Sequence, residues 1–258
     1  MDWDKTYAAI YRSRKDYLKP IIDLDNIGLN DLLGMEEQKN VLYQNTLNFI
    51  HNKGAKIKEQ TTHFYGGAKG TGKSSLIKAI FNEFKDKGLR LVELAKDDLF
   101  ALVDIIDELR EQPFKFILFC DDFSFEKNDD SYKFLKPLLE GSIEAPPQNI
   151  IIYASSNRRH LLSESMSDNQ GVQVAHTELH ASDAAEERLS LSDRFGLWLS
   201  FYQGNLNEYL KLVDFYFKDI KCDKELLHKK AKEFANLRAS RSGRTAKQFY
   251  LAFKESIE

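Results

Sequence analysis

The stretch GGAKGTGKSS at residues 66–75 decides the fold class of this chain. From Gly67 to Ser74 it matches the spacing G-x-x-x-x-G-K-[ST] at every required position. A short run at residues 62–65 that is typical of a strand precedes it, and an apolar pattern of helical period begins at Leu76. A glycine-rich loop between a strand and a helix is the context in which this spacing predicts a phosphate-binding loop.

Each residue type in this loop has a physical role at a phosphate. Glycines let the backbone turn its amide groups inward, and the N-terminus of the next helix is positive. Lys73 can reach terminal phosphates, and the Ser74 hydroxyl can hold magnesium. We therefore predict that ATP and Mg2+ bind here, against the alternative of a glycine-rich turn with an incidental Lys-Ser pair. The predicted binding residues are Gly67, Gly70, Thr71, Gly72, Lys73, Ser74 and Ser75.

Outward from the loop, short β-rich apolar runs alternate with helical patterns. The expected strands are residues 62–65, 90–94, 116–120, 150–154 and 197–202. The runs FILFC and IIIYA are apolar on both faces, as expected of strands that helices cover on each side. The pattern therefore predicts an α/β fold with a parallel five-stranded sheet.

The remaining segments suggest three parts. We expect an N-terminal helical extension at residues 1–28, an α/β nucleotide-binding base at 29–203 and a small helical lid at 204–258, where apolar residues recur at helical spacing. Residues 160–192 are rich in Ser, Asp, Glu and Gln, and they are predicted to form a long functional or partly disordered loop, which is the candidate contact for a partner.

Composition excludes several classes of protein. The 258 residues carry a formal net charge of −3, which disfavours a surface that binds nucleic acid throughout. Only two cysteines are present, so a disulfide framework is not expected. No apolar run approaches the length of a membrane span. We expect a soluble, cytoplasmic protein.

The stretch FILFCDD at residues 116–122 supplies a second half of the site. A buried strand ends there in two carboxylates, of which Asp121 can orient the magnesium shell and Asp122 can polarise the attacking water. Such a pair is otherwise often the start of a solvated loop, but beside a phosphate loop it predicts hydrolysis. Glu is the more usual residue at the second position of such motors, so Glu126 is a candidate to assist.

Further stretches resemble AAA+ ATPases. LNDLLGMEEQKN resembles the segment that packs around adenine in that superfamily, and the resemblance places Leu33 and Gly34 at the contact positions. IIIYASSN ends in Asn157, which matches the polar sensor of the fourth strand, although an Asn there can also cap the next helix. SGRTAKQF places Arg244 as a second sensor in the lid, against the alternative of a surface arginine.

The stretch SLSDRFG places Arg194 where the superfamily carries its arginine finger, in a form close to that of Holliday-junction branch-migration motors. The alternative is a local salt bridge between Asp193 and Arg194. More narrowly, the chain resembles a bacterial AAA+ family of unknown function, through LLG, GTGKSSL, FILFCDD, SYKFLKPLLEG, SNRRHL and SDRFGLWLSFY. This resemblance implies the sheet order 5-1-4-3-2, a nucleotide clamped between base and lid, and a homo-oligomer in which Arg194 reaches the neighbouring subunit.

The function predicted from these features is an ATP-hydrolysing AAA+ ATPase that remodels or loads a macromolecular partner. The alternatives are an ATP-dependent conformational switch with slow turnover and, less favoured, a small-molecule kinase, which would need an acceptor pocket. Residues 223–247 hold eight basic residues against three acidic ones. This excess favours contact with nucleic acid through a basic lid, and its alternative is a solvated lid surface.

Overall fold

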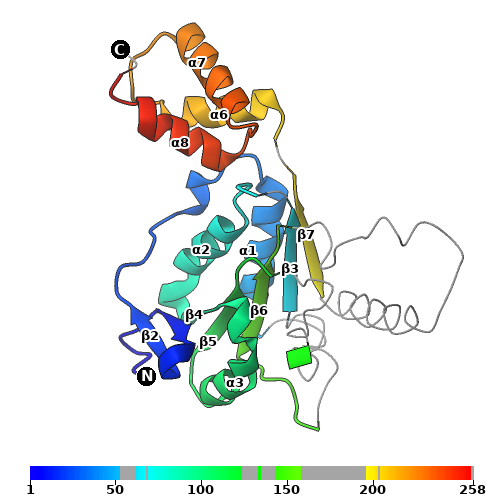
Figure 1. Cartoon of the computed structure of the whole chain (residues 1–258). Coiled ribbons are helices and arrows are strands. Elements are labelled where there is room, and N and C mark those ends of the chain that lie inside the picture. Colours follow the sequence, from blue (N-terminus) through cyan, green and yellow to red (C-terminus); the bar gives the residue numbers. More distant parts are fainter. Residues whose placement is uncertain are drawn as a thin grey trace, which may run out of the picture.

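A seven-stranded sheet lies at the centre of the fold (Figure 1). The computed structural model describes residues 1–52, 62–67, 69–123, 133–134, 143–157, 196–202 and 204–256, with the backbone alone at 62–66. Within them the strand order is β2-β1-β4-β5-β6-β3-β7. The strands are β1 (Ala8–Arg12), β2 (Tyr17–Ile21), β3 (Thr62–Gly67), β4 (Leu89–Leu94), β5 (Lys115–Cys120), β6 (Ile150–Ser155) and β7 (Leu197–Phe201).

The five strands expected from the sequence are β3 to β7, and all neighbouring pairs among them are parallel. Their order from the β7 edge is β7-β3-β6-β5-β4, which is 5-1-4-3-2 when they are numbered along the chain. The α/β fold class is therefore confirmed. The sheet differs in detail from the expectation because two further strands extend it beyond β4.

Those two strands correct the expectation for residues 1–28, which are not a helical extension. Strand β1 pairs in parallel with β4, and β2 pairs antiparallel with β1 as a hairpin. Ala9 and Tyr11 of β1 and Leu18 of β2 are buried in a cluster with the helix on that face. The unpaired edge of β4 offers backbone hydrogen bonds, and this tertiary pairing overrides the weak helical pattern of the segment.

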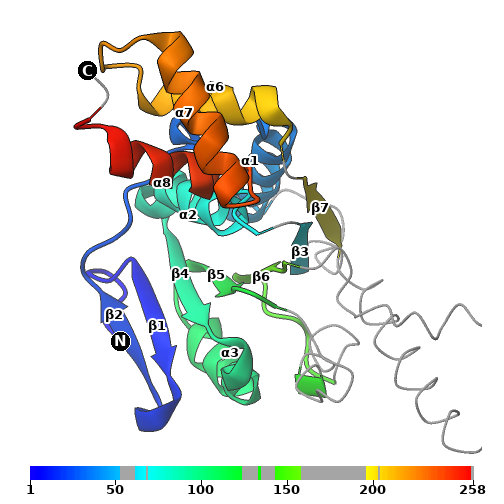
Figure 2. The ribbon, with the colours of Figure 1, turned by 45° about the horizontal axis from the view of Figure 1, so that its top comes forward.

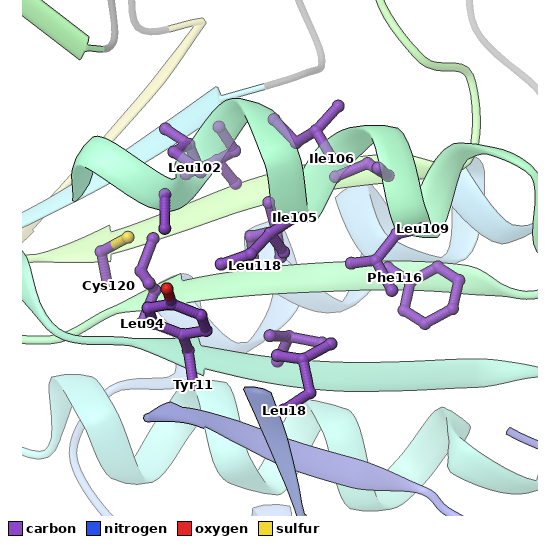
Figure 3. Close-up of a cluster of buried hydrophobic side chains, with 14 of the residues drawn as sticks. Tyr11, Leu18, Leu94, Leu102, Ile105, Ile106, Leu109, Phe116, Leu118 and Cys120 are labelled. Atoms are coloured by element: carbon purple, nitrogen blue, oxygen red, sulfur yellow. The ribbon is translucent and has the colours of Figure 1, made fainter. Parts of the chain in front are cut away.

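Helices cover both faces of the sheet (Figure 2). One face packs against α1 (Glu36–Ile50) and α2 (Lys73–Phe84), and the other packs against α3 (Leu102–Arg110). Figure 3 shows the α3 side, where Leu102, Ile105 and Leu109 point toward Phe116 and Leu118 of β5. Short 3-10 helices span Ser13–Lys15, Leu29–Asp31, Lys85–Lys87 and Lys96–Ala101.

The described residues after 203 form three helices with a separate core, as the periodicity predicted. These helices are α6 (Leu206–Tyr216), α7 (Lys224–Leu237) and α8 (Gly243–Phe253). Tyr209, Leu227 and Phe249 lie in their shared cluster. We call this part the C-terminal helices; its division from the rest as a lid domain remains a prediction. None of the helices in the described ranges has the length and apolar character needed to cross a membrane.

Candidate nucleotide-binding site

The predicted phosphate loop has the strand-loop-helix structure that its sequence indicated. Strand β3 ends at Gly67, and α2 begins at Lys73. Gly67, Gly70 and Gly72 have φ angles of 146°, 77° and 95°, which glycine adopts without steric cost. A Cβ on Gly67 would lie 2.1 Å from the carbonyl oxygen of Phe201 in β7. The loop therefore requires glycine at its first position for packing as well as for conformation.

Lys73 is buried in the first turn of α2, with 5% of its surface exposed. Its Nζ donates to the Gly67 carbonyl oxygen at 3.0 Å and to Oδ1 of Asn157 at 3.4 Å. Burial lowers the pKa of the Lys73 ammonium, Asp121 and Asp122 act in the opposite direction, and Arg244 adds to the lowering. A buried ammonium whose charge is disfavoured fits an anionic ligand, because an anion would stabilise the charged form.

Asp121 and Ser74 are brought together, as the magnesium prediction required. Ser74 Oγ, from α2, donates to Oδ1 of Asp121 at 2.7 Å. The hydroxyl of Ser155, at the end of β6, donates to the same carboxylate oxygen. Oxygen donors of this kind suit Mg2+, which takes one or two protein ligands beside water and substrate phosphates. Within the described ranges, no group of three His, Cys, Asp or Glu side chains lies together as a metal site.

Ser155 is a site residue that the sequence reasoning missed. It is 2% exposed, and the Asp122 amide lies 3.4 Å from its Oγ. The available signal was its place two residues before Asn157 at the end of a strand, because the carboxyl ends of parallel strands meet at one edge of the sheet. Whether a serine at this edge reaches Asp121 depends on which strand lies beside β5, and the sequence pattern alone does not specify that.

Asp122 and Asn157 form a hydrogen-bonded pair next to Lys73. Asn157 Nδ2 donates to Oδ1 of Asp122 at 2.6 Å. The backbone of Asp122 has a φ of 53°, a left-handed conformation that Asp tolerates better than most residues. Asn157 thus contacts both the predicted water-activating acid and the predicted phosphate-binding lysine. Its alternative role as a helix cap concerns residues after 157, which lie outside the described part.

Helix α8 begins against the phosphate loop. The Arg244 amide donates to the Gly70 carbonyl oxygen at 3.5 Å. A Cβ on Gly70 would lie 2.8 Å from Ser242 Oγ and 3.2 Å from Arg244 Cβ. The structure therefore places Arg244 beside the loop, as its prediction required, and Ser242 joins it there although the sequence analysis did not single it out.

The segment predicted to pack around adenine also lies against the loop. The methyl carbon of Met35 is 2.7 Å from the position of a Cβ on Gly72. Leu33 is half-buried, and Gly34 has a φ of 74°. Met35 itself was missed because the glycine spacing does not tell which side chain covers the loop. The adenine contact of Leu33 and Gly34 remains a prediction.

Several predicted residues lie outside the described part of the chain. These are Glu126, Arg194 with its neighbour Asp193, and the loop at 160–192. Thr71 and Ser75 are described and half-buried in the loop and in the first turn of α2. Of the predicted site, the structure thus unites the phosphate loop, Asp121, Asp122, Asn157 and Arg244.

A parallel sheet with this order, a phosphate loop after its first core strand and helices beginning against that loop define the AAA+ fold. A search of solved structures supports it: the FIGL-1 AAA domain in complex with ADP is similar, with a TM-score of 0.54 and 16% identity, covering 83% of this chain and 68% of that one. The chain belongs to the family described as "Protein of unknown function (DUF815)", whose model matches residues 4–256.

A structure titled "Structural Basis for Katanin Self-Assembly" also matches, with a TM-score of 0.48 and 14% identity. That match covers 79% of this chain and 64% of the katanin chain, so this chain spans less than two thirds of its length. No curated protein matches the sequence. The predicted likeness to Holliday-junction motors is not shown by these comparisons and stays a prediction.

Proposed function

We propose that this chain binds ATP with Mg2+ and hydrolyses it, as an AAA+ ATPase that remodels or loads a macromolecular partner. The observation that carries the proposal is the convergence of Lys73, Asp121, Asp122 and Asn157 on the phosphate loop. A positive group for phosphate, an acid for the metal and an acid for water thus occur together. The family match by itself gives no evidence for an activity, because the family is described as one of unknown function.

Each side chain has a defined task in this proposal. Lys73 would exchange its bond to the Gly67 carbonyl for bonds to terminal phosphate oxygens, and so bind the growing negative charge. Bound Mg2+, held by Ser74 and Asp121, would neutralise part of the phosphate charge. Ser155 donates to the same Asp121 oxygen as Ser74 and holds the carboxylate in place, so little reorganisation is needed when the nucleotide arrives.

Asp122 is the group proposed to orient the attacking water and accept its proton. Among the described residues, hydrogen bonds from other side chains reach only its Oδ1, through Asn157. The second carboxylate oxygen can then accept from water, while Asn157 keeps the group oriented. Asp is a methylene shorter than Glu, which leaves slow turnover in a conformational switch as the second candidate.

Phosphate release from Mg-ATP without an added acceptor tests this function. We expect turnover by the wild type, loss of ATP binding in Lys73→Ala, and retained binding with lost turnover in Asp122→Asn. Phosphate release only with a small-molecule acceptor would favour a kinase, and binding with release slower than about one per minute would favour the switch. No ATP binding by the wild type would refute the proposal.

Arg194 is proposed to act on the ATP of a neighbouring subunit in a homo-oligomer. Strand β7 enters the sheet at Leu197, which pairs with His63, whereas Phe201 pairs with Gly67. The start of β7 is therefore four residues, or about 13 Å, from the phosphate loop along the strand. Arg194 stands three residues before that start in the sequence, and we propose that it acts on a neighbouring subunit.

Mixing two inactive variants tests the intersubunit site. Lys73→Ala lacks the phosphate-binding lysine and keeps the finger, and Arg194→Ala has the reverse defect. Mixed oligomers should regain activity that neither protein shows alone, and Arg194→Lys should fail like Arg194→Ala because lysine lacks the guanidinium fork. Co-assembly without recovered activity would contradict the intersubunit mechanism.

The basic surface of the C-terminal helices is the proposed nucleic-acid contact. The exposed basic residues there include Lys224, Lys229, Lys232, Arg238, Arg241 and Lys247. Phosphate contacts make such binding weaken steeply with salt, so oligonucleotide should bind at low salt and raise the ATPase rate. If it does neither, the surface is only solvated.

Residues 160–192 remain the proposed contact for the macromolecular partner. Deletion of residues 168–180 should leave basal ATPase activity unchanged and abolish its response to the partner. Equal loss of both would mean that the segment is structural.

A further inference from the structure

The hydroxyls of Ser240, Ser242 and Thr245 form a closed hydrogen-bonded ring at the start of α8. Ser240 Oγ donates to Ser242 Oγ at 3.2 Å, Thr245 Oγ1 donates to Ser240 Oγ at 2.9 Å, and the remaining pair is 3.0 Å apart. Ser242 and Thr245 are 5% and 4% exposed. Ser240 is half-buried. The mutual hydrogen bonds stabilise the two buried hydroxyls, which would be costly to bury without partners.

Ser242 in this ring has two further contacts. Its Oγ accepts from the Thr245 amide at 3.3 Å, which makes it the N-cap of α8. The same atom lies 2.8 Å from where a Cβ of Gly70 would be, so it rests directly on the phosphate loop. One side chain thus begins the helix and contacts the nucleotide loop.

Arg244 is placed by this arrangement. It is the second residue of α8, its amide donates to the Gly70 carbonyl, and its positive charge helps to lower the pKa of Lys73. The position of the first turn of α8 therefore decides where the Arg244 guanidinium lies. The contact between the Ser242 side chain and Gly70 in turn sets the position of this first turn.

We propose that Ser242 is a positioning residue that couples the C-terminal helices to the phosphate loop and so aligns Arg244 with bound nucleotide. This inference rests on the proposed ATPase function. When nucleotide orders the loop, Gly70 offers a fixed surface to Ser242, the ring stays closed, and the first turn of α8 is held in place. Without the hydroxyl, the loop and α8 order independently.

Ser242→Gly is the informative variant, with Asp223→Ala as its matched control. Glycine at an N-cap weakens a helix much less than alanine does, so Ser242→Gly removes the hydroxyl while it largely keeps the helix start. Asp223 caps α7 by accepting from the Glu225 amide at 2.8 Å. Because α7 has 14 residues, Asp223 lies about 20 Å along that helix from its end nearest Ser242.

The measurements are the melting temperature, the dissociation constant of a fluorescently labelled ATP analogue with Mg2+, and amide hydrogen exchange at residues 243–246. We expect Asp223→Ala to lower the melting temperature by about 3 °C and leave the dissociation constant unchanged. Ser242→Gly should also lower the melting temperature, because it opens the hydroxyl ring. Unlike Asp223→Ala, it should in addition weaken binding about tenfold and abolish the slowing of amide exchange that the analogue causes in the wild type.

The double variant Gly70→Ala with Ser242→Gly adds a test of the contact itself. Alanine at Gly70 should weaken binding, because its φ of 77° strains any side chain and because its Cβ would meet Ser242 and Arg244. Since this change already disrupts the contact with Ser242, the double variant should bind no more weakly than Gly70→Ala alone. Binding by Ser242→Gly equal to the wild type, with unchanged amide exchange, would overturn the inference and leave the ATPase function standing. Failure of the wild type to bind the analogue would overturn both.

Discussion

Lys73→Met should change the stability of the free protein and its affinity for ATP in opposite directions. Methionine retains the unbranched apolar stem and removes the buried charge. Because burial lowers the pKa of Lys73 below its ordinary value of 10.5, the charged ammonium is less stable in the folded chain than in the unfolded chain. The variant should therefore melt no lower than the wild type at neutral pH. Its advantage should shrink as the pH rises toward 10.5, because the folded wild type releases its proton first.

The loss of affinity follows from the bonds that Lys73 could make to phosphate. Its Nζ donates to the Gly67 carbonyl and to Asn157, and it can redirect these hydrogen bonds to a nucleotide. Hydrogen bonds to charged groups contribute about 1.5–3 kcal/mol each. Two of them at the lower limit amount to about 3 kcal/mol, which is about a 150-fold weaker dissociation constant.

Thermal unfolding with and without Mg-ATP tests the expected change in stability and the expected loss of ATP affinity in one assay. At a concentration of 100 times its dissociation constant, ATP should stabilise the wild type by about 2.7 kcal/mol, and the same concentration should barely stabilise the variant. Lys78→Met is the control, since Lys78 lies in the same helix and pairs with Asp25 at 3.5 Å at the surface. A free variant that melts well below the wild type yet keeps the full ATP-induced shift would refute the reasoning.

Three more outcomes can be measured. Gly67→Ala should lower the free energy of unfolding by more than about 3 kcal/mol and abolish ATP binding. Gly88→Ala should cost only about 1 kcal/mol, because Gly88 has a φ of 86° but nothing lies within 4 Å of its Cβ. Similar losses for the two variants on urea unfolding would contradict the packing argument. Tyr153→Phe should cost about 1–2 kcal/mol in the same assay, because Thr46 loses its buried 2.7 Å partner, and an unchanged midpoint would show that water replaces the hydroxyl. Burial raises the pKa of Glu93 above its ordinary 4.5, so its charge destabilises the fold increasingly as the pH rises from 4.5, and Glu93→Gln should gain stability over the wild type between pH 4 and pH 7; an advantage that does not grow with pH would refute this.

The sequence by itself determined the phosphate loop, the parallel α/β core and the paired acids after β5. These features are local, because glycine spacing sets a loop conformation and continuous apolar runs set buried strands. The order 5-1-4-3-2 came from resemblance to a family and not from the pattern of residues. Arg244 was found in the same way, since a lone arginine on a basic helix is not distinctive.

Only the tertiary structure decided which residues far apart in the chain complete the site. Ser155 reaches Asp121 because β6 lies beside β5, and Ser242 rests on Gly70 because α8 folds back over the loop. The N-terminal hairpin was mistaken for helix because the open edge of β4, which selects a strand there, is itself a product of folding. Side-chain chemistry and spacing are written in the sequence, but the neighbour across a strand or a loop is fixed by packing of the whole chain.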